Sequence, residues 1–68
     1  MRKLVVNVAR LTKLAEESLN GFARNANIEV TDLERDTYKE DVVSYVRNFG
    51  LSPERAAEVA WQALCLTR

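Results

Sequence analysis

The sequence predicts an all-α fold, a single small domain of three helices that covers residues 1–68. Three observations lead to this prediction. Apolar residues recur at spacings of three and four over three stretches of the chain, which is the period of one helix face. Residues that commonly cap helices stand before the second and third stretches. Hydrophobic residues make up 47% of the 68 positions, which is enough for one core and leaves no room for a second.

The first expected helix, at about residues 3–25, carries two overlapping apolar seams. Spacings of four and three alternate along the first seam, which is the heptad pattern of a helix that packs against other helices. The first seam consists of Leu4, Val8, Leu11, Ala15, Ser18 and Phe22, and the second of Val5, Val8, Thr12, Ala15, Leu19, Phe22 and Ala26. Together they are wider than the roughly 100° that a surface helix needs to contact one core. Either a homodimer through this helix or a wide buried face in a monomer would use the extra width.

Each end of this expected helix has an alternative interpretation. Residues 2–8 are rich in valine and alternate in a way that also suits a strand. In that interpretation two chains pair their strands, as in a ribbon-helix-helix DNA-binding protein, although the helix order after the strand fits that family poorly. At the other end, Asn20 and Gly21 form a pair that can stop a helix early.

The second expected helix, at about residues 32–48, has a start signal and a stop signal. Thr31 and Glu34 are spaced as a capping box, so the helix begins near Asp32. Gly50 can adopt the left-handed conformation that ends a helix, and Leu51 can fold back onto it. The apolar face between these signals consists of Leu33, Tyr38, Val42, Tyr45, Val46 and Phe49.

The third expected helix, at about residues 53–66, has the clearest signals. Ser52 is a good N-cap, and Pro53 suits the first helical position because its missing N–H has no partner there. Glu54 lies in the first turn, where a negative charge interacts favourably with the helix dipole. The apolar face consists of Ala56, Ala57, Ala60, Trp61, Leu64 and Cys65, and we expect Trp61 to belong to the core.

The second and third expected helices form a helical hairpin that resembles a helix-turn-helix over about 20 residues. The resemblance rests on the turn Phe49-Gly50-Leu51-Ser52-Pro53-Glu54-Arg55 and departs from the motif at Val46, where a small residue is usual. It implies a DNA-binding surface that contains Arg55, Glu58 and Gln62. Because two glutamates on that surface would face phosphate, we favour an ordinary helical hairpin.

The composition excludes several classes of function. Histidine is absent and Cys65 is the single cysteine, so neither a structural zinc site nor a disulfide within the chain can form. The usual general base is therefore missing, and two isolated glycines make no phosphate-binding loop. We expect no enzyme, no cofactor, no metal and no small-molecule substrate. No apolar run approaches the roughly 18 residues of a membrane span, so we expect a cytoplasmic protein with no membrane partner.

Ten Lys and Arg balance ten Asp and Glu, but the charges are unevenly distributed. The net charge is +3 over residues 1–24, −4 over residues 25–41 and +1 over residues 42–68. The leading expectation is a cytosolic protein-interaction module or regulator that binds another protein, itself as a homodimer, or both. Its predicted interface consists of Val5, Val8, Leu11, Ala15, Leu19 and Phe22. The alternative is a small DNA-binding regulator that contacts DNA through Arg55, Glu58 and Gln62.

Overall fold

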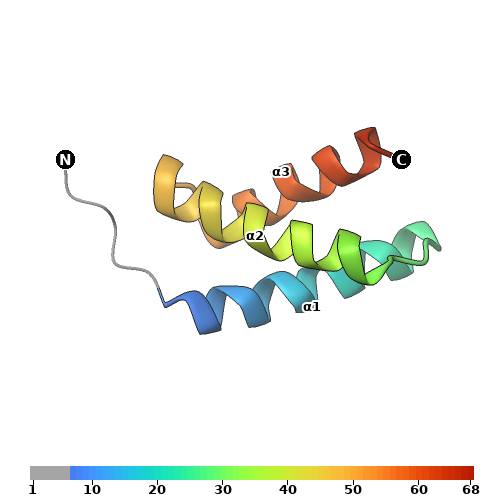
Figure 1. Cartoon of the computed structure of the whole chain (residues 1–68), viewed down its shortest axis with the longest axis horizontal. Helices are drawn as coiled ribbons and strands as arrows, with labels where there is room; N and C mark the ends of the chain where they lie inside the picture. Colours follow the sequence, from blue (N-terminus) through green and yellow to red (C-terminus); the bar gives the residue numbers. More distant parts are fainter. Residues whose placement is uncertain (1–6) are drawn as a thin grey trace.

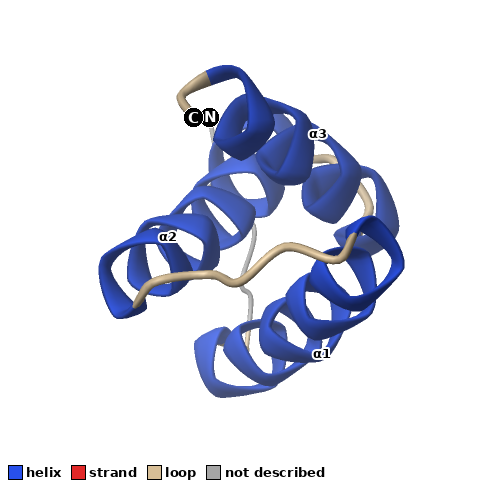
Figure 2. Cartoon of the chain, turned by 90° about the vertical axis from the view of Figure 1, so that its right-hand side faces the viewer, coloured by secondary structure: helices blue, strands red, loops and turns tan. Residues whose placement is uncertain are grey.

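The computed structural model describes residues 7–68, which form a three-helix bundle of α1 (Val8–Ala26), α2 (Asp32–Phe49) and α3 (Pro53–Leu66). Each helix runs opposite to the one before it (Figure 1), and the three surround a common centre (Figure 2). The bundle is elongated, with extents of 40 × 21 × 19 Å. The prediction of a small all-α domain with three helices is confirmed.

Helix α1 begins at Val8, and the predicted start near residue 3 is wrong. Asn7 has an extended backbone conformation, and its side-chain oxygen accepts a hydrogen bond from the backbone N–H of Arg10 at 3.1 Å. This contact makes Asn7 the N-cap, which fixes the first helical residue. Val8 is helical, and the rest of the predicted strand and seam at residues 1–6 lies outside the described residues.

The end of α1 lies one residue beyond its predicted position. Asn27 adopts the left-handed conformation with φ 56° and caps the helix. Gly21, which could have stopped the helix early, lies inside it. The alternative, an early stop at Asn20 and Gly21, therefore does not occur, and the helix continues to Ala26.

Helices α2 and α3 begin and end with the predicted signals. Thr31 and Glu34 form the capping box of α2, and Gly50 closes that helix with φ 67°. The N–H of Leu51 then reaches back to the carbonyl of Tyr45 at 3.4 Å, as in a Schellman motif. Ser52 caps α3 by accepting a hydrogen bond from the Arg55 N–H at 3.2 Å.

The core lies on the shared axis of the three helices. Tyr38, Leu19 and Val42 are its largest fully buried side chains. The wide face of α1 is used within the bundle, because α1 packs against both α2 and α3. The ring of Phe22 stacks on Trp61 of α3, with ring centroids 5.4 Å apart, and both side chains pack against the core. The buried residues are Leu11, Ala15, Leu19, Tyr38, Val42, Val46, Ala56, Ala57, Ala60 and Leu64.

Two residues assigned by spacing to the apolar face of α2 are instead exposed. Leu33 is 77% exposed and Phe49 is 70% exposed. Both lie in terminal turns of α2. Phe49 follows the buried Val46 in the last turn, whereas Leu33 precedes Tyr38 by five residues, about 140° around the helix, so it points away from the buried face.

Helices α2 and α3 pack together as a hairpin and diverge toward the ends distant from the turn at Gly50 (Figure 1). The Tyr38 hydroxyl donates a hydrogen bond to the Ala57 carbonyl at 3.2 Å. Farther from the turn, the long Arg68 side chain reaches Glu34 at 3.0 Å and bridges the two ends distant from Gly50. The predicted packing of α2 against α3 as a helical hairpin is confirmed.

Candidate protein-docking groove

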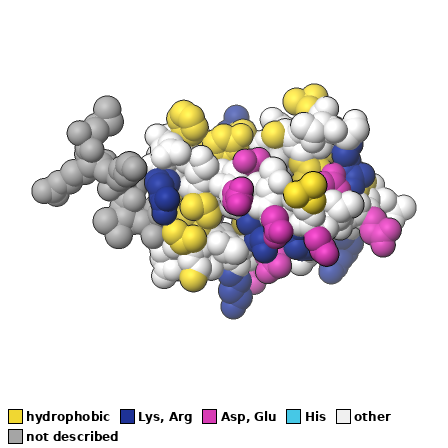
Figure 3. All heavy atoms as spheres, viewed as in Figure 1, with side chains coloured by type: hydrophobic (Ala, Val, Ile, Leu, Met, Phe, Trp, Pro, Cys, Tyr) yellow, Lys and Arg dark blue, Asp and Glu magenta, His cyan; other side chains and the backbone are white. Residues whose placement is uncertain are grey.

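A groove of about 210 Å³ lies between the first half of α2 and the second half of α3. We call it the α2–α3 groove. Its surface is mainly apolar. Figure 3 shows hydrophobic side chains in this part of the molecule beside acidic and basic ones. It is lined by Leu33, Glu34, Thr37, Tyr38, Asp41, Ala60, Ala63, Leu64 and Thr67. A more open depression between α1 and α2, about 540 Å³ in volume, is lined largely by charged and polar side chains, so a larger share of its surface is polar.

Small side chains on α3 create the α2–α3 groove. Ala60 and Ala63 extend only a methyl group toward α2, so the space beside Tyr38 is left unfilled by α3. The Tyr38 ring is held at the floor by its burial and by the hydrogen bond to Ala57. Burial also raises the pKa of the Tyr38 hydroxyl to about 12, which keeps this hydroxyl a neutral donor. The floor is thus a fixed, uncharged surface.

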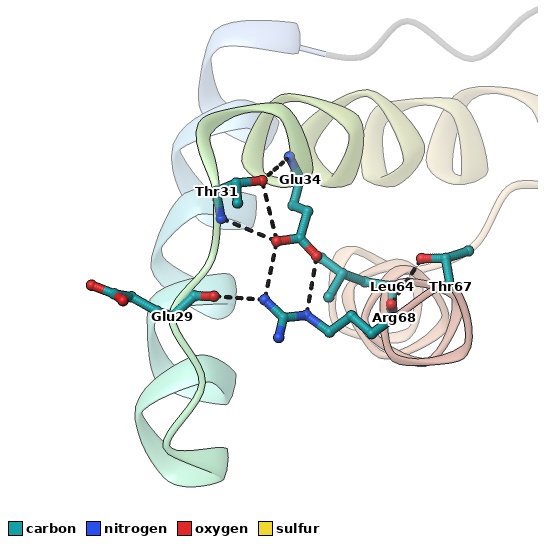
Figure 4. A network of polar contacts seen from close by, with 6 residues as sticks. All are labelled: Glu29, Thr31, Glu34, Leu64, Thr67 and Arg68. Atoms are coloured by element: carbon teal, nitrogen blue, oxygen red, sulfur yellow. Dashed lines mark hydrogen bonds and ion pairs between the residues drawn. The ribbon is translucent and has the colours of Figure 1, made fainter.

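One end of the groove is closed by a network of polar contacts (Figure 4). The Arg68 guanidinium donates to both carboxylate oxygens of Glu34 at 3.0 Å and to the Glu29 carbonyl at 2.6 Å. Glu34 in turn accepts from the Thr31 backbone N–H at 3.1 Å. This backbone hydrogen bond and then Arg68 lower the pKa of Glu34 below its ordinary value. The network joins the beginning of α2 to the residues that follow α3.

Asp41 lines the other part of the groove and has the opposite environment. Its side chain is half-buried, and within residues 7–68 its carboxylate makes no hydrogen bond or ion pair. Burial, and secondarily the neighbouring charge of Glu40, raise the pKa of Asp41. The carboxylate therefore lacks a compensating positive charge in the folded chain.

The structure separates the six residues of the predicted dimer interface. Leu11, Ala15 and Leu19 are buried inside the bundle, so they belong to the core and present no surface to a partner. This corrects the expectation for these three residues, because α2 and α3 already cover the face that they share. Phe22 is partly buried on Trp61, and Val8 is 42% exposed. Val5 lies outside the described residues.

The predicted DNA-contact residues lie on α3 and outside the α2–α3 groove. Arg55 and Glu58 form an ion pair at 2.9 Å, and both side chains are exposed. Gln62 is exposed one turn farther along. The only positive charge of this set is thus paired within its own helix.

Sequence reasoning missed the groove, although two of its signals are present in the chain. The alanines at positions 56, 57, 60 and 63 indicate a helix that neighbours can approach closely, and residues 25–41 carry an excess of acidic side chains. The exposure of Leu33 also has a signal, because Leu33 precedes Tyr38 by five residues, about 140° around a helix.

Comparison of the chain with protein-family models, with curated proteins and with solved structures finds no match. Within residues 7–68, no helix has the length and apolar character needed to cross a membrane. The same residues contain no cluster of three or more potential metal ligands.

Proposed function

We propose that this domain acts by binding another protein, and that it docks an apolar segment of that protein in the α2–α3 groove. The observation that carries the proposal is Leu33, a large apolar residue left 77% exposed at the edge of a hollow with an apolar floor. Burying a side chain of this kind contributes about 1.5–3 kcal/mol. A partner that covers Leu33 and fills the hollow gains this contribution without rearranging the bundle.

The size of the groove supports a protein ligand. Pockets for small molecules commonly enclose about 300–1,000 Å³, whereas this groove encloses about 210 Å³. Such a space suits one or two side chains presented by a larger partner, as when a helix lays its apolar face into a groove. The free Cys65 is consistent with action in the reducing cytoplasm, which we retain as part of the proposal.

Filling the groove tests the proposal. Ala63 lines the groove and is half-buried, so Ala63→Phe occupies the space with an aromatic ring. Gln62→Phe places the same ring on the exposed neighbouring position and serves as the matched control. We expect a partner captured from the lysate of the producing organism to be retained by the wild type and by Gln62→Phe. The Ala63→Phe variant should bind it about 10- to 100-fold more weakly.

The capture is repeated after nuclease treatment, and circular dichroism verifies that both variants are helical. Equal retention by Ala63→Phe and Gln62→Phe contradicts docking in the groove. Partners that disappear with nuclease, accompanied by nucleic acid in the eluate, would instead favour the DNA-binding alternative at Arg55, Glu58 and Gln62.

Self-association through α1 is a second candidate, and it is favoured by two residues. Val8 and Leu14 are large apolar side chains on α1 that are 42% and 39% exposed. Val8 continues the line of Leu11, Ala15 and Leu19 into the first turn, and Leu14 lies beside that line. The two residues offer a smaller apolar surface than the six-residue interface expected from the sequence. A homodimer would have to add contacts from outside this pair.

A further inference from the structure

We propose that the segment docked in the α2–α3 groove is cationic, with a Lys or Arg that pairs with Asp41 beside an apolar residue that fills the hollow. This inference rests on the proposed function, because it names the chemistry of the partner for the same groove. It identifies Asp41 as the residue that selects the partner and the alanine-lined hollow as the site of its anchor.

The charge arrangement around the groove carries the inference. Two carboxylates line it, and one of them, Glu34, is already engaged by Arg68. Asp41 is half-buried and makes no ion pair within residues 7–68. A half-buried carboxylate with no counter-charge loses hydration without compensation, which a cation supplied by a ligand would restore.

No basic residue of the described chain is positioned to supply that charge. Arg68 is held by both oxygens of Glu34 and by the Glu29 carbonyl. Lys39 extends toward α1, where its ammonium lies 3.8 Å from Glu16, and it also lies 3.8 Å from Asp36. The groove therefore presents a net negative surface, in agreement with the charge of −4 over residues 25–41.

The same arrangement disfavours a second copy of this domain as the occupant. A two-fold symmetric dimer places the same surface of both copies face to face. If the α2–α3 grooves faced each other, the two Asp41 carboxylates would approach without an intervening cation. Like charges opposed across an interface select against that partner.

The spacing along α2 sets the length of the ligand. Leu33 and Asp41 are eight residues apart on one helix, a distance of about 12 Å. Two turns of a helical ligand cover this length. Its apolar anchor would lie between Leu33 and Asp41, and its cation would lie one turn from the anchor, beside Asp41. On a helix, positions separated by three or four residues share a face, so the anchor and the cation are expected at that spacing.

A peptide selection tests the inference and does not require the natural partner to be identified. Random twelve-residue peptides displayed on phage are selected on the folded wild-type domain, after peptides that bind Ala63→Phe have been removed. We expect the enriched peptides to carry Lys or Arg three or four residues from a Leu, Ile or Phe. An enriched peptide should bind Asp41→Asn about 5- to 10-fold more weakly than the wild type in fluorescence anisotropy.

Charge reversal provides the sharper comparison. Selection on Asp41→Lys should enrich Asp or Glu at the position of the cation. Glu40→Lys makes the same change in net charge on the side of α2 that faces α1, and it should leave the preference for Lys and Arg unchanged.

The outcomes separate this inference from the proposed function. Groove-dependent peptides that lack a cation, or that bind Asp41→Asn as tightly as the wild type, overturn the role of Asp41 and leave the groove as a docking site. An identical shift in preference for Glu40→Lys also overturns it, because the effect would then be one of overall charge. If no peptide distinguishes the wild type from Ala63→Phe, the docking proposal fails as well.

Discussion

Glu34 and Asp41 lie about two turns apart on α2 and experience opposite environments. Glu34 accepts hydrogen bonds from Thr31 and Arg68, which favour its charged form, whereas burial disfavours the charged form of Asp41. The Glu34 carboxylate helps to join α2 to the end of α3, whereas the Asp41 carboxylate lines the groove without a partner in residues 7–68. Residues that cost stability without a structural partner are common at functional sites, which fits the role proposed for Asp41.

The lowered pKa of Glu34 predicts a loss of stability in acid. A carboxyl whose folded pKa is depressed contributes stability above its unfolded pKa and loses that contribution as the pH falls through the folded value. We expect Glu34→Gln to be less stable than the wild type at pH 7 and the difference to shrink in acid, because glutamine keeps the capping interaction and loses the ion pair. Urea unfolding at a series of pH values measures this.

The matched control is Glu17→Gln, which alters an exposed glutamate of α1. Its midpoint should follow that of the wild type across the series. If Glu34→Gln also follows the wild type at every pH, the contact with Arg68 contributes nothing to stability.

The raised pKa of Asp41 predicts the opposite dependence of stability on pH. The folded chain binds the proton of this carboxyl more tightly than the unfolded chain, so stability decreases as the pH rises through its pKa. We expect Asp41→Asn to unfold at a higher urea concentration than the wild type at pH 7, with the gain disappearing in acid, where Asp41 is protonated. A lower midpoint at pH 7 would show that Asp41 has a structural partner and would remove the argument for an external cation.

At the scale of the elements, the helix caps determine how well the sequence predicts the fold. The capping box at Thr31, the stop at Gly50 and the Ser52-Pro53 start each act within one turn, so neighbouring residues are enough to predict these boundaries. The predicted start of α1 is wrong because the apolar spacing continues past Asn7, although asparagine is a favoured N-cap. Apolar spacing does not reveal where a helix begins when the residues before and after its first residue have the same spacing.

The groove and the burial of the α1 residues could not be predicted from neighbouring residues in the sequence. The groove depends on the space left between α2 and α3, and whether Leu11 faces a second chain depends on how α2 and α3 divide the face of α1. Both are properties of three helices packed together. The sequence identifies the apolar residues of each helix but does not show which residues of the other helices they contact.

The two glycines predict stability changes of opposite sign. Gly21 lies inside α1, and a Cβ built there meets no atom within 4 Å. We expect Gly21→Ala to stabilise the fold by about 0.5–1 kcal/mol, because alanine loses less backbone entropy in a helix. Gly50→Ala should destabilise by about 1–2 kcal/mol, since its φ of 67° is strained for residues with a Cβ. Urea midpoints of the purified domain test both changes, and a destabilised Gly21→Ala would indicate that a second copy of the chain occupies that surface.

In the molecule as a whole, the three helices bury a common core and leave isolated apolar residues exposed near the ends of the helices. Leu33 lies in the first turn of α2, Phe49 in its last turn, and Val8 in the first turn of α1. Single exposed apolar residues are ordinary on protein surfaces and carry little argument by themselves. Leu33 differs because it stands beside a hollow with an apolar floor.

Self-association through α1 makes a prediction at this scale. If Val8 lies in a homodimer interface, Val8→Asp should give a lower mass than the wild type in light scattering, because a charge would be buried without a partner. Ala9→Asp introduces the same charge at the neighbouring exposed position and should retain the wild-type mass. A wild-type mass equal to one chain of 7.7 kDa, or an unchanged mass for Val8→Asp, contradicts the dimer.

Docking of a partner between α2 and α3 can be observed residue by residue in an NMR titration of the isotope-labelled domain with a phage-selected peptide. Docking in the groove predicts that the largest changes in backbone chemical shift fall on residues 33–41 and 60–67, with small changes along the exposed side of α1. The largest changes on Arg55, Glu58 and Gln62, or on Val8 and its neighbours, would contradict the account and locate the binding surface elsewhere.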